Sequence, residues 1–155
     1  MKVISAITLS ELTDILQDLI EYEDLEGEYE VLENAETDSV SIFCTIFGME
    51  FFIFPFGAGP FYDGFLLSAT FGAHLDPELL CTEFNSRHKF ANAAPVTIES
   101  EENNDADDVV IIEVEKLVLL KGGVTDEHIK EIIQLWTGML MHAEELFEGA
   151  PAESE

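Results

Sequence analysis

Acidic side chains are the most plentiful groups in this sequence that could take part in chemistry, so metal binding is considered first. Asn103, Asp105 and Asp107 alternate like the start of a calcium-binding loop. The sixth position of that loop is Asp108, where such loops carry glycine, and the twelfth is Val114, where they carry glutamate. We therefore predict no metal site, and a weak cation site in this acidic stretch stays an open alternative.

Histidine and cysteine are the other residues that could serve as ligands, bases or nucleophiles. The histidines form no His-x-x-x-His pair and have no cysteine at ligand spacing; they are His74, His88, His128 and His142. Cys44 and Cys81 form no Cys-x-x-Cys pair and are expected to be reduced core thiols. No Gly-x-Ser-x-Gly elbow is present. We predict no catalytic residue and no cofactor, and a small enzyme or ligand sensor whose site is assembled only in space remains the alternative.

The charge balance limits the partners that this chain can bind. Six Lys and Arg residues stand against 33 Asp and Glu residues, which gives a formal net charge of -27 at pH 7. Between Val3 and Ser86 there is no Lys or Arg, so the basic footprint that binds a phosphate backbone is missing. We therefore expect neither nucleic-acid nor membrane binding, and a partner must supply positive charge or a well-fitting apolar surface.

The location expected from the sequence is the cytoplasm. Met1 to Leu9 contains one Lys and a short apolar run that meets Glu11 without a small-residue cleavage site, so export is not predicted. Ser39 to Leu75 has only two charged residues, but glycine and proline interrupt it. A membrane helix needs about 20 uninterrupted apolar residues, so we interpret this segment as strands of a buried sheet.

The length and composition predict a single folded domain. A chain of 155 residues, of which 47% are hydrophobic, can bury a core of its own. Each apolar pattern needs its neighbours for burial, so we expect one domain over residues 1–148. Residues 149–155 are expected to be a disordered acidic tail.

The first half of the chain predicts one helix followed by an antiparallel meander. Thr8 and Glu11 form a capping box, and apolar residues follow at helical spacing. From Val40 the apolar period changes to two, which is typical of strands. The predicted strands cover residues 29–32, 40–47, 51–56 and 65–71, of which the first is a short possible strand.

The second half predicts two helices that flank a hairpin. Asp76 is a good N-cap with Pro77 at the first helical position, and this helix is expected to end near Ala91. Thr125 caps a long final helix with an apolar stripe. The hairpin strands are expected over residues 95–99 and 109–119. The element order predicts an α+β fold, an antiparallel sheet packed by helices.

Phenylalanine is concentrated in the predicted meander, where nine of the twelve lie between Phe43 and Phe71. The strand over residues 51–56 carries bulky apolar groups on both faces, so both faces must be covered. In one interpretation the chain's own helices cover one face and its loops close the other. In the other, an exposed face or edge binds a dimer partner or another extended chain. The candidate surface residues are Phe51, Phe52, Phe54, Phe56, Phe61 and Phe65.

Several short motifs stand out beyond periodicity in the second half of the chain. They are Phe84-Asn85, Lys89-Phe90-Ala91-Asn92-Ala93, the strand segment Glu113 to Leu120, Lys121-Gly122-Gly123-Val124-Thr125 and Trp136. In this order and spacing they resemble the YbjN-like family, bacterial proteins proposed to be sensory transduction regulators. The first half matches only in its order of a helix followed by strands. Phe84 stands where the family has tryptophan, and the acidic loop of residues 101–108 is longer than is usual there.

The resemblance implies a fold like that of type III secretion chaperones, with the order α-β-β-β-α-β-β-α, and small acidic members that dimerise. It implies no catalytic residue. The matching positions Asn85, Phe90, Gly122, Gly123 and Trp136 then have structural roles. We expect the asparagine to bond nearby backbone, the glycines to adopt positive backbone angles, and the tryptophan to anchor the last helix.

These observations give a leading hypothesis and two alternatives. The leading hypothesis is a cytoplasmic, homodimeric regulatory module that holds a partner chain against an apolar surface of its sheet. The first alternative is a dedicated type III secretion chaperone that serves one effector. The second is the small enzyme or ligand sensor named above.

Overall fold

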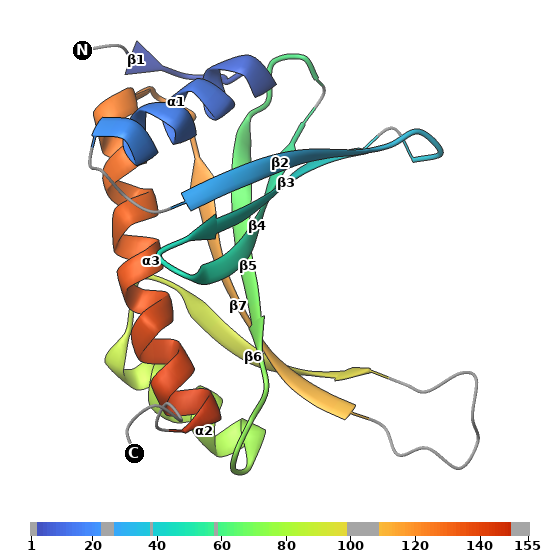
Figure 1. Cartoon of the computed structure of the whole chain (residues 1–155), viewed down its shortest axis with the longest axis vertical. Coiled ribbons are helices and arrows are strands. Elements are labelled where there is room, and N and C mark those ends of the chain that lie inside the picture. The colour runs from blue at the N-terminus through green and yellow to red at the C-terminus, as the bar shows by residue number, and fades with distance from the viewer. Residues whose placement is uncertain (1–2, 23–26, 38, 58, 99–108, 150–155) are drawn as a thin grey trace. The chain divides into compact units, whose positions relative to one another are not determined.

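The computed structural model describes residues 3–22, 27–37, 39–57, 59–98 and 109–149 of the chain. The acidic stretch of residues 101–108 and the predicted tail from residue 150 onward lie outside the described residues. In chain order the elements (Figure 1) are β1 (Val3–Ile4), α1 (Leu9–Tyr22), β2 (Gly27–Asn34), β3 (Ser39–Ile46), β4 (Met49–Phe56), β5 (Gly64–Phe71), α2 (Pro77–Arg87), β6 (Asn92–Ile98), β7 (Val109–Leu119), β8 (Val124–Thr125) and α3 (Asp126–Glu148).

The predicted α+β class is confirmed. Six strands are hydrogen-bonded in the order β2-β3-β4-β5-β7-β6, and β1 pairs separately with β8. The β2–β3, β3–β4, β4–β5 and β6–β7 pairs are antiparallel, as the meander and the hairpin predicted. The sequence did not predict β1 and β8, because a two-residue strand is too short to show a period.

The chain forms two compact units, and three elements run through both of them. The first unit comprises residues 1–68 and 117–139, and the second comprises residues 69–116 and 140–155. The chain passes from one unit to the other within β5, β7 and α3. The expectation of one domain over residues 1–148 stays a prediction.

Helix starts in the first unit follow the predicted caps. The backbone N–H of Thr8 donates to Glu11 Oε1 at 3.0 Å, and the N–H of Glu11 donates to Thr8 Oγ1 at 3.1 Å, which is the reciprocal capping box. At α3, the N–H of His128 donates to Thr125 Oγ1 at 3.1 Å. The glycines before this cap have the positive φ that was expected, 90° at both Gly122 and Gly123.

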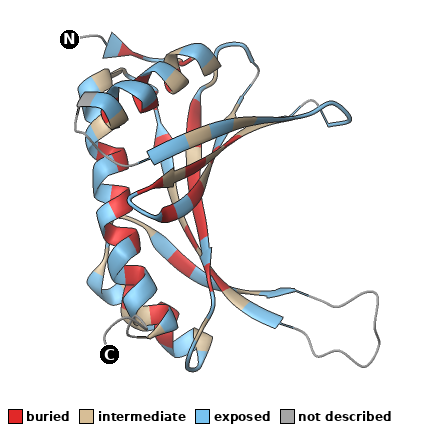
Figure 2. Ribbon diagram, viewed as in Figure 1, coloured by how far each residue is buried: buried red, intermediate tan, exposed pale blue. Residues whose placement is uncertain are grey.

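The core of the first unit lies between one face of its strands and the apolar stripes of α1 and α3 (Figure 2). Alternate residues of β3 and β4 are buried there, including Ile42, Cys44, Phe51 and Ile53. The ring of Phe51 meets Trp136 of α3 edge-on, with the centroids 6.0 Å apart. Trp136 is fully buried, which confirms its anchoring role, and its indole Nε1 has no hydrogen-bond partner among the described residues.

In the second unit, α2 begins as predicted and ends earlier. Asp76 accepts a bond from the N–H of Glu78 at 3.1 Å, and Pro77 occupies the first turn. The helix ends at Arg87, and His88 is already extended with φ -119° and ψ 115°. The predicted end near Ala91 is therefore wrong, because β6 begins at Asn92 and the chain must be extended before it.

Candidate functional site

The six phenylalanines predicted as a partner surface do not lie on one surface. Phe51 and Phe65 are buried, with 1% and 0% of their area exposed, on the sheet face that the helices cover. The prediction is wrong for these two residues, because successive side chains of a strand point to opposite faces and these two point inward. Phe61 is 61% exposed in the loop between β4 and β5.

The other three phenylalanines lie with a fourth on the opposite face of the first unit's strands. We define the aromatic face as Phe43, Phe52, Phe54 and Phe56. Phe43 and Phe52 are cross-strand partners with ring centroids 5.0 Å apart, and the rings of Phe52 and Phe54 stack at 5.5 Å and 14°. Phe54 is 38% exposed and the other three are half-buried. The surface residues predicted from the sequence did not include Phe43, although the strand pairing places it opposite Phe52.

Gly64 allows the ring of Phe56 to pack directly against the neighbouring strand. Phe56 is paired with Gly64 of β5, and its ring lies directly over that glycine. A Cβ atom on Gly64 would lie 2.7 Å from the Phe56 ring and would also collide with the carbonyl oxygen of Val118. The close approach therefore requires glycine here, although the sequence pattern alone did not single it out.

Carboxylates border the aromatic face on β2 and β4. Glu30 is paired with Phe43, and both Glu28 and Glu50 are paired with Thr45, so cross-strand register puts all three on the aromatic face's side. All three are exposed. We call Glu28, Glu30 and Glu50 the acid rim. An aromatic surface beside carboxylates favours a partner that offers apolar groups together with positive charge.

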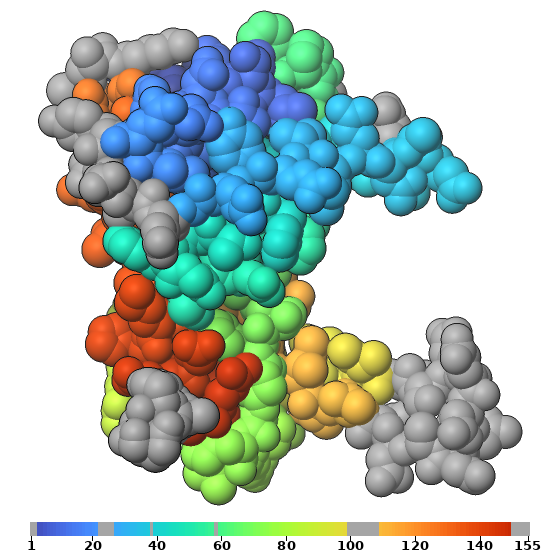
Figure 3. Space-filling view, in the orientation of Figure 1, coloured from blue at the N-terminus to red at the C-terminus, as the bar shows by residue number. Residues whose placement is uncertain are grey.

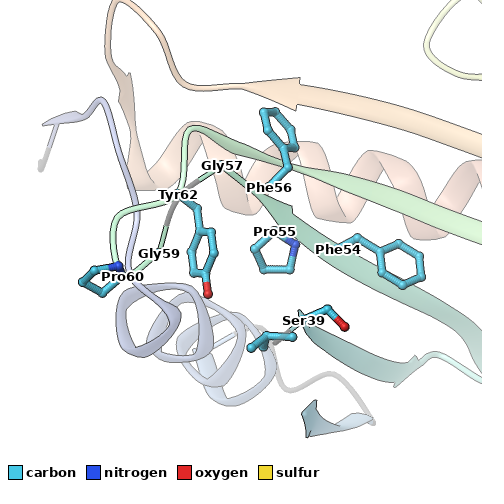
Figure 4. A pocket seen from close by; sticks show the side chains of 9 residues that line it. Ser39, Phe54, Pro55, Phe56, Gly57, Gly59, Pro60 and Tyr62 are labelled. Atoms are coloured by element: carbon cyan, nitrogen blue, oxygen red, sulfur yellow. The ribbon is translucent and has the colours of Figure 1, made fainter. Parts of the chain in front are cut away.

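A cavity of about 830 Å³ opens beside the aromatic face, where β3 and β4 separate (Figure 4). Pairing between these strands ends at Ile42 with Ile53. The lining residues are Ser39, Val40, Phe54, Pro55, Phe56, Gly57, Gly59, Pro60 and Tyr62. The backbone of Tyr62 is fixed by two hydrogen bonds with Ile7, of 2.8 and 2.9 Å, which hold the loop at this end of the cavity.

The second unit has a smaller cavity, of about 390 Å³, lined by Arg87, His88, His142, Glu145 and Leu146. The two imidazole centroids are 6.4 Å apart. Burial lowers the pKa of His88, and the charges of His142 and Arg87 lower it further, so this ring favours the neutral form. Arg87 forms an ion pair with Glu83. Among the described residues no three His, Cys, Asp or Glu side chains are placed to hold a metal ion.

The remaining family-motif positions have structural roles in the second unit. Both amide atoms of Asn85 bond the backbone of Ala93, Nδ2 to its carbonyl at 3.0 Å and Oδ1 from its N–H at 2.9 Å. This confirms the expected bond to nearby backbone. Phe90 is half-buried beneath Lys116, whose Nζ lies 4.7 Å from the ring centroid, a cation–π contact.

The cysteines are free and buried, as the sequence predicted. Burial raises the pKa of Cys44 to about 12, so its thiol stays protonated at neutral pH. Burial also raises the pKa of Cys81, and the charge of Glu78 adds to this. A thiolate is the reactive form of cysteine, so neither residue is arranged as a nucleophile.

No helix in the described part of the chain has both the length and the apolar run needed to cross a membrane.

Comparisons with known proteins give one solved structure. No protein-family model and no curated protein matches the sequence. The chain is similar to the crystal structure of YbjN, a protein from E. coli proposed to be a transcription regulator. The identity is 13%, the match covers 84% of this chain and 86% of that one, and the TM-score is 0.49.

Proposed function

We propose that this protein is a non-catalytic regulatory module that holds another protein chain on its aromatic face. The observation that carries the proposal is the row of three rings, Phe43, Phe52 and Phe54, on the sheet face opposite the buried core. Ring stacking keeps these side chains in place before a partner arrives. A surface that is ordered in advance loses less conformational entropy on binding.

The exposed part of the rings supplies the affinity. A phenylalanine side chain buries roughly 150–250 Å² when it is fully covered, and apolar burial contributes about 25 cal/mol per Å². Phe54 is 38% exposed, so it has at most about 2 kcal/mol still to gain when a partner covers it, and the three less exposed rings have less. A cluster of this kind is typical of the centre of a protein interface, where aromatic anchors dominate the binding energy.

The acid rim supplies the selectivity. Exposed carboxylates at Glu28, Glu30 and Glu50 repel acidic chains and attract basic ones, which raises the association rate for a basic partner. Between Val3 and Ser86 the sequence has no Lys or Arg that could offset the charge of these carboxylates. The preferred partner surface is therefore apolar and positively charged.

The test of the aromatic face is binding of an apolar fluorescent dye to three forms of the protein. The double variant Phe43→Ser with Phe54→Ser should lose most of the dye fluorescence of the wild-type protein. Leu135→Ser is the matched control, because Leu135 is 57% exposed on α3 in the same unit. It should keep the fluorescence. Equal fluorescence from all three proteins, with unchanged circular dichroism, would contradict the proposal.

A homodimeric state is part of the same proposal, through a different surface. Leu75, in the loop before α2, and Leu79, in the first turn of α2, are 62% and 68% exposed in the second unit. An apolar patch of this kind is typical of a contact between copies. Light scattering should give the mass of two chains for the wild-type protein and of one chain for Leu79→Glu. A wild-type monomer at micromolar concentration would contradict self-association and leave the aromatic face untouched.

A further inference from the structure

The separation of β3 and β4 creates an opening inside the sheet of the first unit. Beyond the last pair, Ile42 with Ile53, the register would place Ser41 opposite Phe54, Val40 opposite Pro55 and Ser39 opposite Phe56. None of these three pairs forms in the described part of the chain. We call the segments Ser39–Ser41 and Phe54–Phe56 the strand fork. The space-filling view shows the far end of the β2–β3 hairpin standing clear of the rest of this unit (Figure 3).

Each side of the strand fork already has a partner on its outer edge. Ser39, Val40 and Ser41 pair with Asn34, Glu33 and Leu32 of β2. Phe54, Pro55 and Phe56 pair with Leu66, Phe65 and Gly64 of β5. The inner edges of both segments therefore face the 830 Å³ cavity, which is lined by Ser39, Val40, Phe54, Pro55 and Phe56 of the fork. An unpaired strand edge of this kind is a template for another extended chain.

The sequence explains why the fork stays open. Proline cannot donate a ladder hydrogen bond and is confined to strand edges and bulges, so Pro55 suits a position where pairing stops. The loop that follows is held back from β3 by the two backbone bonds between Tyr62 and Ile7. The hairpin end and the loop are thus attached to different neighbours, β2 on one side and the N-terminal segment on the other.

We propose that the strand fork binds a short extended segment of a partner protein, with Lys or Arg alternating with apolar residues. This inference rests on the proposed function and names the binding mode at the same surface. The segment pairs with β3, β4 or both through its backbone, as in β-strand addition. The open edges are three residues long, which spans about 10 Å at the rise of a β-strand. Because successive residues direct their backbone groups to opposite sides, the segment bonds to the N–H and carbonyl of Val40 and to the carbonyl of Pro55.

Charge complementarity selects the basic, alternating sequence. A strand in the fork directs every second side chain to the aromatic face, where a cation can lie over the Phe54 ring on the same face as Glu30. Its other side chains point toward Val40 and Pro55, which are apolar. Across β2 the same region carries exposed Glu33, paired with Val40. An acidic segment meets only like charge here.

The experiment uses two capped peptides, Lys-Val-Lys-Phe-Lys-Val-Lys and the same peptide with alternate backbone nitrogens methylated. Methylation removes backbone donors and keeps every side chain and charge. The unmethylated peptide should bind, and the methylated one should bind about tenfold or more weakly, because each backbone hydrogen bond contributes roughly a factor of two to ten. Amide exchange at Val40, whose backbone faces the fork in the alternation of β3, should slow only with the unmethylated peptide.

A pair of protein variants tests the position. Val40→Arg puts bulk and positive charge into the cavity lining and should weaken the peptide at least tenfold. Leu32→Arg adds the same charge on the neighbouring strand, outside the lining, and should weaken it much less. Circular dichroism checks that both variants are folded.

Three results would overturn the proposal, and they separate it from the proposed function. Equal binding of both peptides, with changed chemical shifts of the Phe43 and Phe52 rings, would rule out binding at the strand fork. The proposal for the aromatic face would still stand. Failure of both peptides while the dye still reports the aromatic face would lead to the same conclusion. Failure of both peptides together with dye binding that is insensitive to Phe43→Ser and Phe54→Ser would overturn both.

Discussion

Asn85 shows how a single side chain fixes the path of the chain between α2 and β6. Its amide bonds both the N–H and the carbonyl of Ala93, a pairing that imitates a strand partner at the start of β6. Ala93 is buried, so neither backbone group could turn to water instead. The turn after the helix is therefore determined by one residue eight positions earlier.

Asn85→Ala should lower the free energy of unfolding by about 1–3 kcal/mol, because it leaves both Ala93 backbone groups without a partner. Denaturant titration measures the change. Asn92→Ala is the control, since Asn92 is an exposed asparagine on β6, and it should change stability by less than about 0.5 kcal/mol. Equal effects of the two substitutions would show that the Asn85 bonds contribute nothing specific.

Cys44 links one buried side chain to the stability of the protein at high pH. Its pKa is about 12 in the folded chain and 9.0 as the ordinary value, so the folded state keeps a proton that the unfolded state releases. The stabilisation is complete below pH 9.0 and is lost as the pH rises toward 12. Between these values wild-type stability should fall by about 1.4 kcal/mol per pH unit more than that of Cys44→Ala. Parallel pH profiles for the two proteins would contradict the shift.

At the scale of elements, two glycines in the first unit should respond in opposite ways to the same substitution. Gly64→Ala should destabilise the protein by about 2 kcal/mol or more, because the new methyl meets the Val118 carbonyl and the Phe56 ring. Gly138→Ala should stabilise it by roughly 1 kcal/mol, since Gly138 is an exposed position of α3 with nothing within 4 Å. Thermal unfolding of both variants checks the signs. A neutral Gly64→Ala would contradict the close approach of β4, β5 and Phe56.

Sequence reasoning predicted the elements where local chemistry decides them. The capping box at Thr8 and Glu11, the Asp76 cap and the period-two pattern from Val40 each depend on neighbours a few residues away, and all three are confirmed. The predicted end of α2 was wrong because the true end depends on the hydrogen bond from Asn85 to Ala93. Hydrophobic periodicity does not reveal such a contact. Tertiary hydrogen bonds override helix propensity at such places.

The candidate site was only partly predictable for a similar reason. Alternation along β4 separated two sets of phenylalanines, but it could not say which set the helices cover. Phe51 and Phe65 are on the covered side, and Phe52 and Phe54 are on the other. The strand fork depends on where the pairing of β3 with β4 stops. In the sequence, Pro55 is the residue that indicates this point.

At the scale of the whole molecule, charge is the dominant property. A formal net charge of -27 destabilises a compact chain through self-repulsion, and it also keeps acidic partners away. Ion pairs offset little of it, because those at Lys130 with Asp18 and at Arg87 with Glu83 involve carboxylates that are 65% and 44% exposed and so are screened by solvent. In the proposed function, this excess of acid is what selects a basic partner.

Added salt should therefore have opposite effects on folding and on binding. Raising the ionic strength from about 0.01 M to 0.15 M shortens the screening length from roughly 30 Å to 8 Å. The unfolding temperature should rise, since repulsion within the folded chain is screened, while affinity for a basic peptide should fall. Calorimetry and peptide titration at both salt concentrations measure the two effects. A peptide affinity that does not change with salt would contradict the role of the acid rim.

The central claim is that a partner chain lies on the aromatic face, and site-specific photo-crosslinking tests it most directly. Benzoylphenylalanine in place of Phe54 should give, on illumination in the native cell, a covalent adduct with one predominant polypeptide rich in Lys and Arg near the crosslinked residue. The same probe in place of Leu135, which is more exposed than Phe54 (57% against 38%), should give little of that adduct. The same adduct in equal yield from both positions, or none from position 54, would contradict the account.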